Sequence, residues 1–178
     1  MKNIDKYLFQ ALDNYPYWLE GTIESLDYAL SYDAKNVMAL CLYGRIQTEQ
    51  LQDYEAAKAY FQEALAIDIA AVTVYPYYID TLLLNEDYAE ATKLMDFALT
   101  LKGINKNEVL LKKVQLLERK QDVKGALKLL KEVKLTSFGD NAYAIEEVEK
   151  RLKAKKELLQ PKAKKKAKKK PKKKGVKK

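Results

Sequence analysis

The residues that could do chemistry are few, and they exclude most classes of enzyme. The sequence of 178 residues contains no histidine and one cysteine, Cys41. A histidine-based triad and a Cys/His zinc site therefore cannot be assembled. The six glycines are scattered and form neither a P-loop nor a GxGxxG loop. The acid pairs Glu86-Asp87 and Glu146-Glu147 fit ordinary surface charge. We therefore expect a non-catalytic protein that uses no cofactor and no metal.

Lysine at the C-terminus is the strongest charged feature. Residues 161–178 hold 12 of the 33 basic side chains and no acid, so residues 1–160 carry 21 basic and 25 acidic side chains. A segment with this composition repels itself and has nothing apolar to bury, which predicts a disordered lysine-rich tail. Lysine lacks the fork of arginine, and no aromatic is present to stack bases. Any nucleic-acid or other polyanion binding would be sequence-blind and salt-dependent. The candidate contacts are Lys164, Lys165, Lys166, Lys168, Lys169, Lys170, Lys172, Lys173 and Lys174. A merely solubilising tail remains an alternative.

The acidic remainder of the chain is built from paired amphipathic helices. In residues 42–68, Leu42, Tyr43 and Ile46 follow one helical stripe, and apolar residues recur at helical spacing again after Tyr54. A short polar break separates the two stripes, so the stretch predicts a helical hairpin. Gly44 would allow a neighbouring helix to approach closely, and one extra residue near Leu51 would lengthen the turn.

This hairpin recurs along the chain at a spacing of about 34 residues. Three positions of the second helix stay in register across four copies: a small one, a bulky one and a second small one. They are Thr22, Ala57, Ala91 and Ala126; Leu26, Phe61, Met95 and Leu130; and Ala29, Ala64, Ala98 and Val133.

With Tyr43-Gly44 on the first helix and Ala57, Phe61 and Ala64 on the second, the pattern resembles the tetratricopeptide repeat (TPR) family. The resemblance implies an all-α, right-handed α-solenoid of TPR-like helix hairpins. We expect a domain over residues 1–160, with repeats at about 1–35, 36–70, 71–105 and 106–137. A solvating capping helix at about 140–160 would close the solenoid, with Asp140 or Asn141 at its start. A coiled-coil seam along that helix is the alternative.

TPR arrays are similar to one another in binding a peptide or helix of a partner protein in a concave groove. Transferring the groove positions of the family gives candidate partner-binding residues in three repeats. They are Met38, Cys41, Arg45 and Thr48; Thr73, Asp80 and Leu83; and Glu108, Leu111, Gln115 and Glu118. Arg45 could pair with a carboxylate of the partner or with one of its own chain. The chaperone-binding subset uses a basic clamp, but Cys41, Leu42, Thr73 and Tyr77 stand at those positions, so that activity is not expected.

Aromatic residues in two places allow either a packing or an interface role. Tyr75, Tyr77 and Tyr78 lie together in residues 75–78, where packing between helices is the preferred interpretation. Trp18 is expected to pack as well. No apolar run approaches the length of a membrane span, and one free cysteine fits a reducing compartment. We therefore expect a soluble cytoplasmic protein, or a nuclear one if the source is a eukaryote. The leading hypothesis for its function is a protein-interaction scaffold. The alternative hypothesis is auxiliary, non-specific nucleic-acid binding through the tail.

Overall fold

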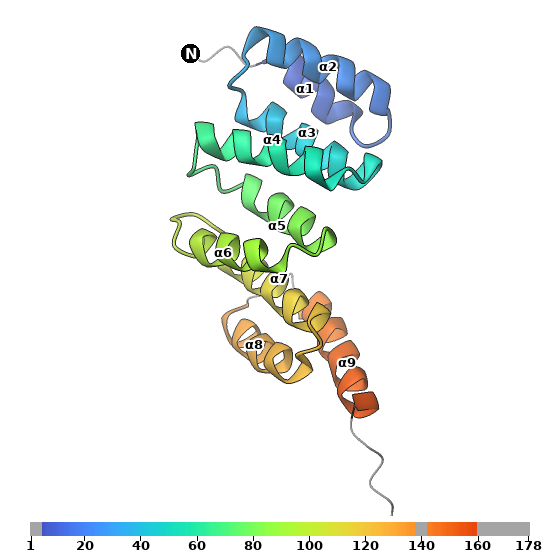
Figure 1. Cartoon of the computed structure of the whole chain (residues 1–178), viewed down its shortest axis with the longest axis vertical. Coiled ribbons are helices and arrows are strands. Elements are labelled where there is room, and N and C mark those ends of the chain that lie inside the picture. Colours follow the sequence, from blue (N-terminus) through green and yellow to red (C-terminus); the bar gives the residue numbers. More distant parts are fainter. Residues whose placement is uncertain (1–4, 138–141, 160–178) are drawn as a thin grey trace, which may run out of the picture.

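The protein is a row of helices that pack in sequence order along one long axis (Figure 1). The computed structural model describes residues 5–137 and 142–159, and within these ranges the regular elements are all helical. Their bounds are α1 Lys6–Asn14, α2 Leu19–Tyr32, α3 Val37–Ile46, η1 Gln47–Leu51, α4 Tyr54–Ile67, α5 Val74–Leu84, α6 Tyr88–Ala98, α7 Lys106–Arg119, α8 Val123–Thr136 and α9 Ala142–Leu159. The prediction of an all-α helical repeat solenoid is confirmed.

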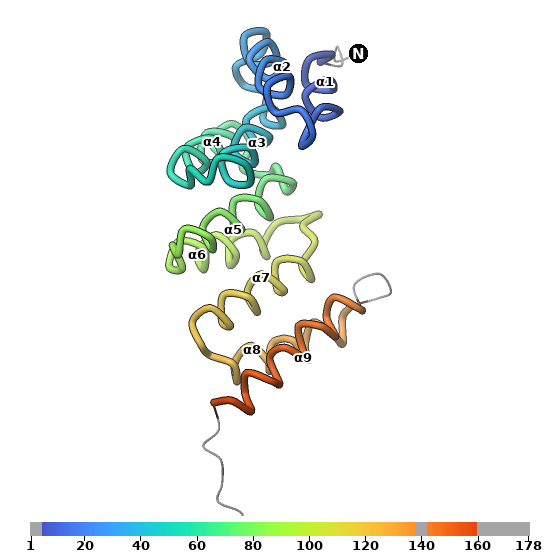
Figure 2. The backbone as a smooth tube through the Cα atoms, turned by 90° about the vertical axis from the view of Figure 1, so that its right-hand side faces the viewer, coloured from blue at the N-terminus to red at the C-terminus, as the bar shows by residue number. Residues whose placement is uncertain are grey.

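Each hairpin pairs a first helix with the helix that follows it, as α1 with α2, α3 with α4, α5 with α6 and α7 with α8. The first helices also contact one another directly, α3 against α5 and α5 against α7. Figure 2 shows the resulting stack from the side, with the α1–α2 hairpin at one end and α9 at the other. The surface that runs along α3, α5 and α7 is therefore one continuous face.

The turn inside each of the last three hairpins follows one rule. Gln52, Glu86 and Gln121 adopt the left-handed conformation, with φ of 56°, 62° and 62°. An aspartate follows each of them, and Asp53 and Asp122 cap the next helix by accepting from backbone N–H groups at 3.0 and 2.9 Å. A left-handed residue reverses the chain, and the cap satisfies amides that the helix leaves unpaired. In the first hairpin Trp18 precedes α2 and provides no side-chain cap.

The extra residue of the second hairpin does not lie in its turn. It widens the end of the first helix into the π-helix η1 (Gln47–Leu51). The amide of Asp53 consequently reaches back six residues to Gln47, whereas Asp87 reaches five residues to Leu82. The inserted residue is thus absorbed before the turn, which corrects the expectation of a longer turn, and α4 begins in the same register as its counterparts.

The register found in the sequence defines the core. All residues at the three recurring positions of α2, α4, α6 and α8 are buried, with exposed fractions of 1% or less. Gly44 meets one of these residues, because a Cβ atom there would lie 2.7 Å from the ring of Phe61. The expected close approach at Gly44 is therefore confirmed. Trp18 departs from expectation: it packs over Gly21 but remains 55% exposed.

The last helix, α9, covers the end of the α7–α8 hairpin. Ile145 and Leu152 are buried against Val114 and the core side of α8. Glu118 of α7 receives Arg151 at 2.9 and 2.8 Å and Lys155 at 2.7 Å, which fixes α9 to α7. The hydrogen bond from Arg151 is the main reason that the pKa of Glu118 falls to about 2. The expected start of this helix at Asp140 or Asn141 lies outside the described residues.

Candidate functional site

A groove runs along the face formed by α3, α5, α7 and α9. Three adjoining hollows make it up, with volumes of about 470, 360 and 320 Å³. Lys112 of α7 lines all three. Tyr77 and Asp80 are shared by two of the hollows, as are Glu108 and Gln115. Because the hollows share their walls, they form one elongated groove centred on Lys112.

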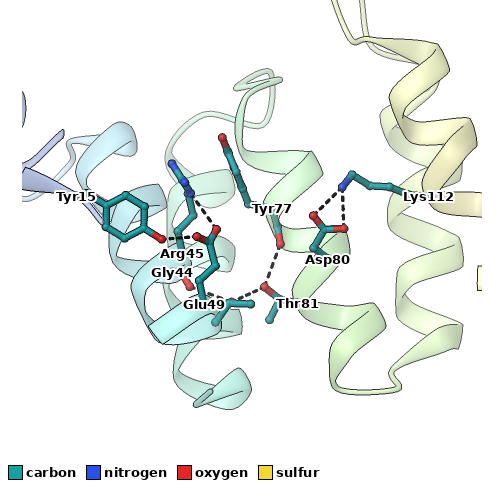
Figure 3. A network of polar contacts seen from close by, with 9 residues as sticks. Tyr15, Gly44, Arg45, Glu49, Tyr77, Asp80, Thr81 and Lys112 are labelled. Atoms are coloured by element: carbon teal, nitrogen blue, oxygen red, sulfur yellow. Dashed lines mark hydrogen bonds and ion pairs between the residues drawn. The ribbon is translucent and has the colours of Figure 1, made fainter. Parts of the chain in front are cut away.

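One end of the groove is built around Arg45. Its guanidinium lies 4.8 Å from the ring centre of Tyr15 and 4.3 Å from that of Tyr77, so it is stacked between two aromatic faces. Its Nε donates to Glu49 at 3.2 Å, and Tyr15 donates its hydroxyl to the same carboxylate (Figure 3). Burial lowers the pKa of Arg45, but the hydrogen bond and charge of Glu49, together with Tyr77 and Tyr15, outweigh burial and keep that pKa raised. Burial, aided by Glu49, raises the pKa of Tyr15 to about 12.

This arrangement settles the partner of Arg45 in the free protein. The pair with Glu49 is intramolecular and connects α3 to η1, while the two tyrosines come from the α1–α2 turn and from α5. Three hairpins therefore meet at this side chain. Arg45 is therefore held in place by contacts within its own chain.

The centre of the groove holds a second ion pair above a small buried polar contact. Lys112 donates to both carboxylate oxygens of Asp80, at 2.7 and 2.6 Å, and connects α7 to α5 (Figure 3). Beneath them the hydroxyl oxygens of Thr48 and Thr81 lie 2.6 Å apart. Each hydroxyl also lies 3.0 Å from a carbonyl of its own helix. The two hydroxyl groups have one proton each, which is too few for all three contacts. One hydroxyl therefore donates to the other, and the hydroxyl that accepts donates to the carbonyl of its own helix.

The charges that line the groove hollow of about 470 Å³ do not cancel. Its lining includes Arg45, Lys112 and Arg119 with Glu49 and Asp80. The two carboxylates are taken by the first two cations, and Arg119 is exposed without an ion pair to any residue in the described ranges. Gln115 stands one turn away on the same face of α7. This end of the groove therefore offers spare hydrogen-bond donors and a positive charge.

The predicted groove residues divide into two sets according to their place on the helix. One set consists of Met38, Thr73 and Glu108 with Arg45, Asp80 and Gln115, and none of these side chains is buried. Residues seven apart differ by only about 20° around a helix, so each pair presents one face. Thr73 contacts Met38 at 3.7 Å between hydroxyl and sulfur, and every member except Met38 lines a hollow. Leu111, half-buried, lines the hollow between α7 and α9.

The other set is buried in the contacts between helices, although Thr48 and Leu83 still form part of the lining of the hollow of about 470 Å³. Cys41, Thr48 and Leu83 are at most 6% exposed, and Glu118 is 9% exposed. They lie three residues from a groove-facing position, a rotation of about 60° towards the neighbouring helix. Burial raises the pKa of the Cys41 thiol to about 11, which keeps it protonated. The carboxylate of Glu118 is bound by Arg151 and Lys155 of α9, so it attaches α9 to α7.

The sequence did not single out three side chains that shape the groove. Tyr77 was grouped with a packing cluster, and its neighbours Tyr75 and Tyr78 are indeed buried at 0% and 4% exposure. Tyr77 instead stacks on Arg45 in the groove. Lys112 and Arg119 could have been found from their spacing, because they lie three before and four after Gln115. The lysines of residues 161–178 lie outside the described residues.

The comparison with known families agrees with this architecture. A family model described as the ARM repeat of tetratricopeptide repeat protein 21 matches residues 32–144. The chain belongs to this family. The matched range contains α3 to α8 and thus most of the groove. A search of curated proteins found no match.

Membership of the ARM-repeat family supports a TPR-like helical repeat domain, a type that generally works without catalysis. In the described part of the chain no group of three or more acidic or cysteine side chains could hold a metal ion. None of the helices described is long and apolar enough to cross a membrane. The family match confirms the resemblance to TPR repeats that was inferred from the repeat register.

Proposed function

We propose that this protein is an interaction scaffold that holds a segment of a partner protein in the groove along α3, α5 and α7. The single observation that carries the proposal is the continuity of the groove: three hollows share Lys112 and together extend from α3 to α9. An extended peptide or a helix is long and narrow, as is this groove. Family membership supports the same use, since helical repeat arrays present concave surfaces to protein partners.

The chemistry of the groove suggests how a partner would be held. Arg119 and Gln115 offer donors at the end near the α7 C-terminus, and Tyr77 offers an aromatic edge. The ion pairs of Arg45 and Lys112 are already formed and fix the walls. A partner therefore gains affinity from side chains that are pre-organised, with little ordering cost.

The test is capture of a protein partner from nuclease-treated lysate by the full chain and by groove variants. Arg119→Glu reverses the exposed charge of the groove, and Lys93→Glu makes the same change on an exposed part of α6 outside the hollows. We expect Arg119→Glu to reduce recovery at least about tenfold, in line with the loss of a charged hydrogen bond, and Lys93→Glu to leave it unchanged. Equal recovery with both variants would overturn the groove as the binding surface.

A second candidate function is non-specific binding of nucleic acid through the lysine-rich tail. The observation that favours it is the charge of the neighbouring helices. Residues 106–137 and 142–159 carry 14 Lys or Arg against 8 Asp or Glu, so the basic character continues from the tail into α7–α9. Anisotropy of a labelled 30-nucleotide DNA would fall steeply with salt and with removal of residues 161–178. Affinity indifferent to both changes would exclude this candidate.

A further inference from the structure

Charge is divided along the long axis of this molecule. Residues 5–105 carry 16 Asp or Glu against 6 Lys or Arg, whereas the described residues from 106 to 159 have an excess of 6 positive charges. Residues 161–178 add 12 lysines beyond α9. Figures 1 and 2 agree that the α1–α2 hairpin and the C-terminal end of α9 lie at opposite ends of the body. One end of the molecule is therefore acidic and the other strongly basic.

The acidic end also carries an unpartnered aromatic face. Tyr7 of α1 stacks on Tyr28 of α2 with ring centres 5.2 Å apart, and Tyr32 follows one turn later. Their exposed fractions are 39%, 53% and 77%, although they belong to helices whose other sides are buried. We call Tyr7, Tyr28 and Tyr32 the tyrosine face. Because α1 is the first helix of the described chain, no further described helix covers the outer side of the α1–α2 hairpin.

The surroundings of the tyrosine face specify the charge of what could cover it. Glu24 and Glu20 lie one and two turns before Tyr28 on the exposed side of α2, and neither makes an ion pair within the described residues. Tyrosine rings attract ammonium groups to their faces, and nearby carboxylates add to that attraction. A lysine-rich segment without acids satisfies both demands. The chain itself contains such a segment in residues 161–178.

We propose that the protein associates head to tail, with the tyrosine face of one copy receiving the lysine-rich residues 161–178 of a second copy. The opposite placement of the two ends favours a second copy over the same chain, because the tail would have to turn back along the whole body. A contact of this kind uses two different surfaces, so each copy keeps one end free. Association therefore continues beyond the dimer as concentration rises. It is independent of the groove and does not rest on the proposed scaffold function.

Sedimentation velocity of nuclease-treated full chain tests the proposal, with absorbance spectra to show that nucleic acid is absent. At 50 mM NaCl we expect the average mass to rise with concentration above the 20.5 kDa of one chain. At 500 mM NaCl we expect the association constant to fall at least about tenfold, because exposed charges are then screened over a few ångströms. A chain ending at Gln160 should remain a monomer at both salt concentrations.

Two complementary variants then identify the surfaces. The first variant keeps the lysine-rich tail but disrupts the tyrosine face, through the substitutions Glu20→Lys, Glu24→Lys, Tyr28→Ser and Tyr32→Ser. The second variant, the chain ending at Gln160, keeps the tyrosine face and lacks the tail. Each alone should be monomeric, and their equimolar mixture should form a dimer that grows no further. Glu63→Lys with Glu86→Lys changes the net charge equally on exposed positions elsewhere and should associate like the unchanged chain.

Several results would overturn the proposal. A full chain that remains monomeric at 50 mM NaCl would do so, as would one that becomes compact without gaining mass, which would indicate its own tail on the tyrosine face. A dimer that survives removal of residues 161–178 would point to a contact such as pairing of α9. Assembly seen only when nucleic acid is retained would assign the tail to polyanions. Circular dichroism of each variant establishes that the helices are intact.

Discussion

The ion pairs of Glu118 allow a quantitative prediction about the attachment of α9. The perturbation is Glu118→Gln, which keeps the shape of the side chain and removes its charge. Arg151 contacts both carboxylate oxygens at 2.9 and 2.8 Å, and Lys155 approaches one of them at 2.7 Å. The carboxylate side chain is only 7% exposed, while those of Arg151 and Lys155 are 52% and 48% exposed. The charge that is lost is therefore buried, and its partners can be hydrated without it.

The pKa of Glu118 sets an upper limit on the effect. Lowering that pKa from 4.5 to about 2, mainly through Arg151, corresponds to at most about 3 kcal/mol. Solvent around the two half-exposed cations screens the pairs, so we expect a loss of about 1–2 kcal/mol. Because the folded pKa lies below the unfolded one, this stabilisation is complete above about pH 4.5 and is lost as the pH falls towards 2.

Hydrogen exchange of peptides within residues 142–159 measures the effect directly, since a terminal helix of a repeat array can open by itself. At pH 7 Glu118→Gln should reduce the protection of α9 by about 5–30-fold. Glu132→Gln, on an exposed position of α8, is the matched control and should leave protection unchanged. In unfolding experiments the difference between Glu118→Gln and the unchanged chain should be much smaller at pH 2.5 than at pH 7. A difference that is as large at pH 2.5 as at pH 7 would refute the argument.

Three further predictions concern the core and a helix cap. Gly44→Ala should lower the free energy of unfolding, measured in urea, by about 1 kcal/mol, because overpacking against Phe61 outweighs the better helix propensity of alanine. Adding Phe61→Leu to the same chain should recover part of this loss. Cys41 should react with a thiol reagent at pH 8 at least about a hundredfold more slowly than in urea, since its pKa is about 11 and it is 3% exposed; equal rates would contradict its burial. Asp122→Ala should lower the free energy of unfolding by about 1 kcal/mol through loss of the α8 cap, whereas Gln121→Ala, which removes no side-chain cap, serves as the control.

The sequence predicted the fold well because the packing of a repeat array is local. Every small or bulky position that recurs in α2, α4, α6 and α8 is buried, since a repeated contact demands a repeated residue size. The start of α2 was predicted less well. Proline suits the first turn of a helix, so Pro16 favours a helix that begins there. The helix α2 instead begins at Leu19, because the residues from Pro16 to Trp18 belong to the turn after α1. In the other hairpins an aspartate at the position of Trp18 marks the start more clearly.

The candidate site was predicted in part, and the reason lies in the angle between side chains. A transferred motif names positions three or four apart as one face, although a step of three rotates by about 60° from the axis of the groove. The side chains of Arg45, Asp80 and Gln115 therefore project into the groove. Thr48, Leu83 and Glu118, each three residues later, are buried between the helices, and the first two contribute to the groove only as part of its lining. The stacking of Arg45 between Tyr15 and Tyr77 joins residues from three hairpins. No local pattern could have indicated it.

The π-helix η1 bears on how this array can change in length during evolution. An insertion inside a rigid helix would normally rotate everything after it by about 100° and destroy the packing of the next hairpin. Here the added residue is confined between Gln47 and Leu51, and Phe61 still meets Gly44 across the hairpin. The end of a first helix is therefore a place where natural variants can gain or lose a residue without disturbing later repeats. We expect length differences among homologues to concentrate at such helix ends.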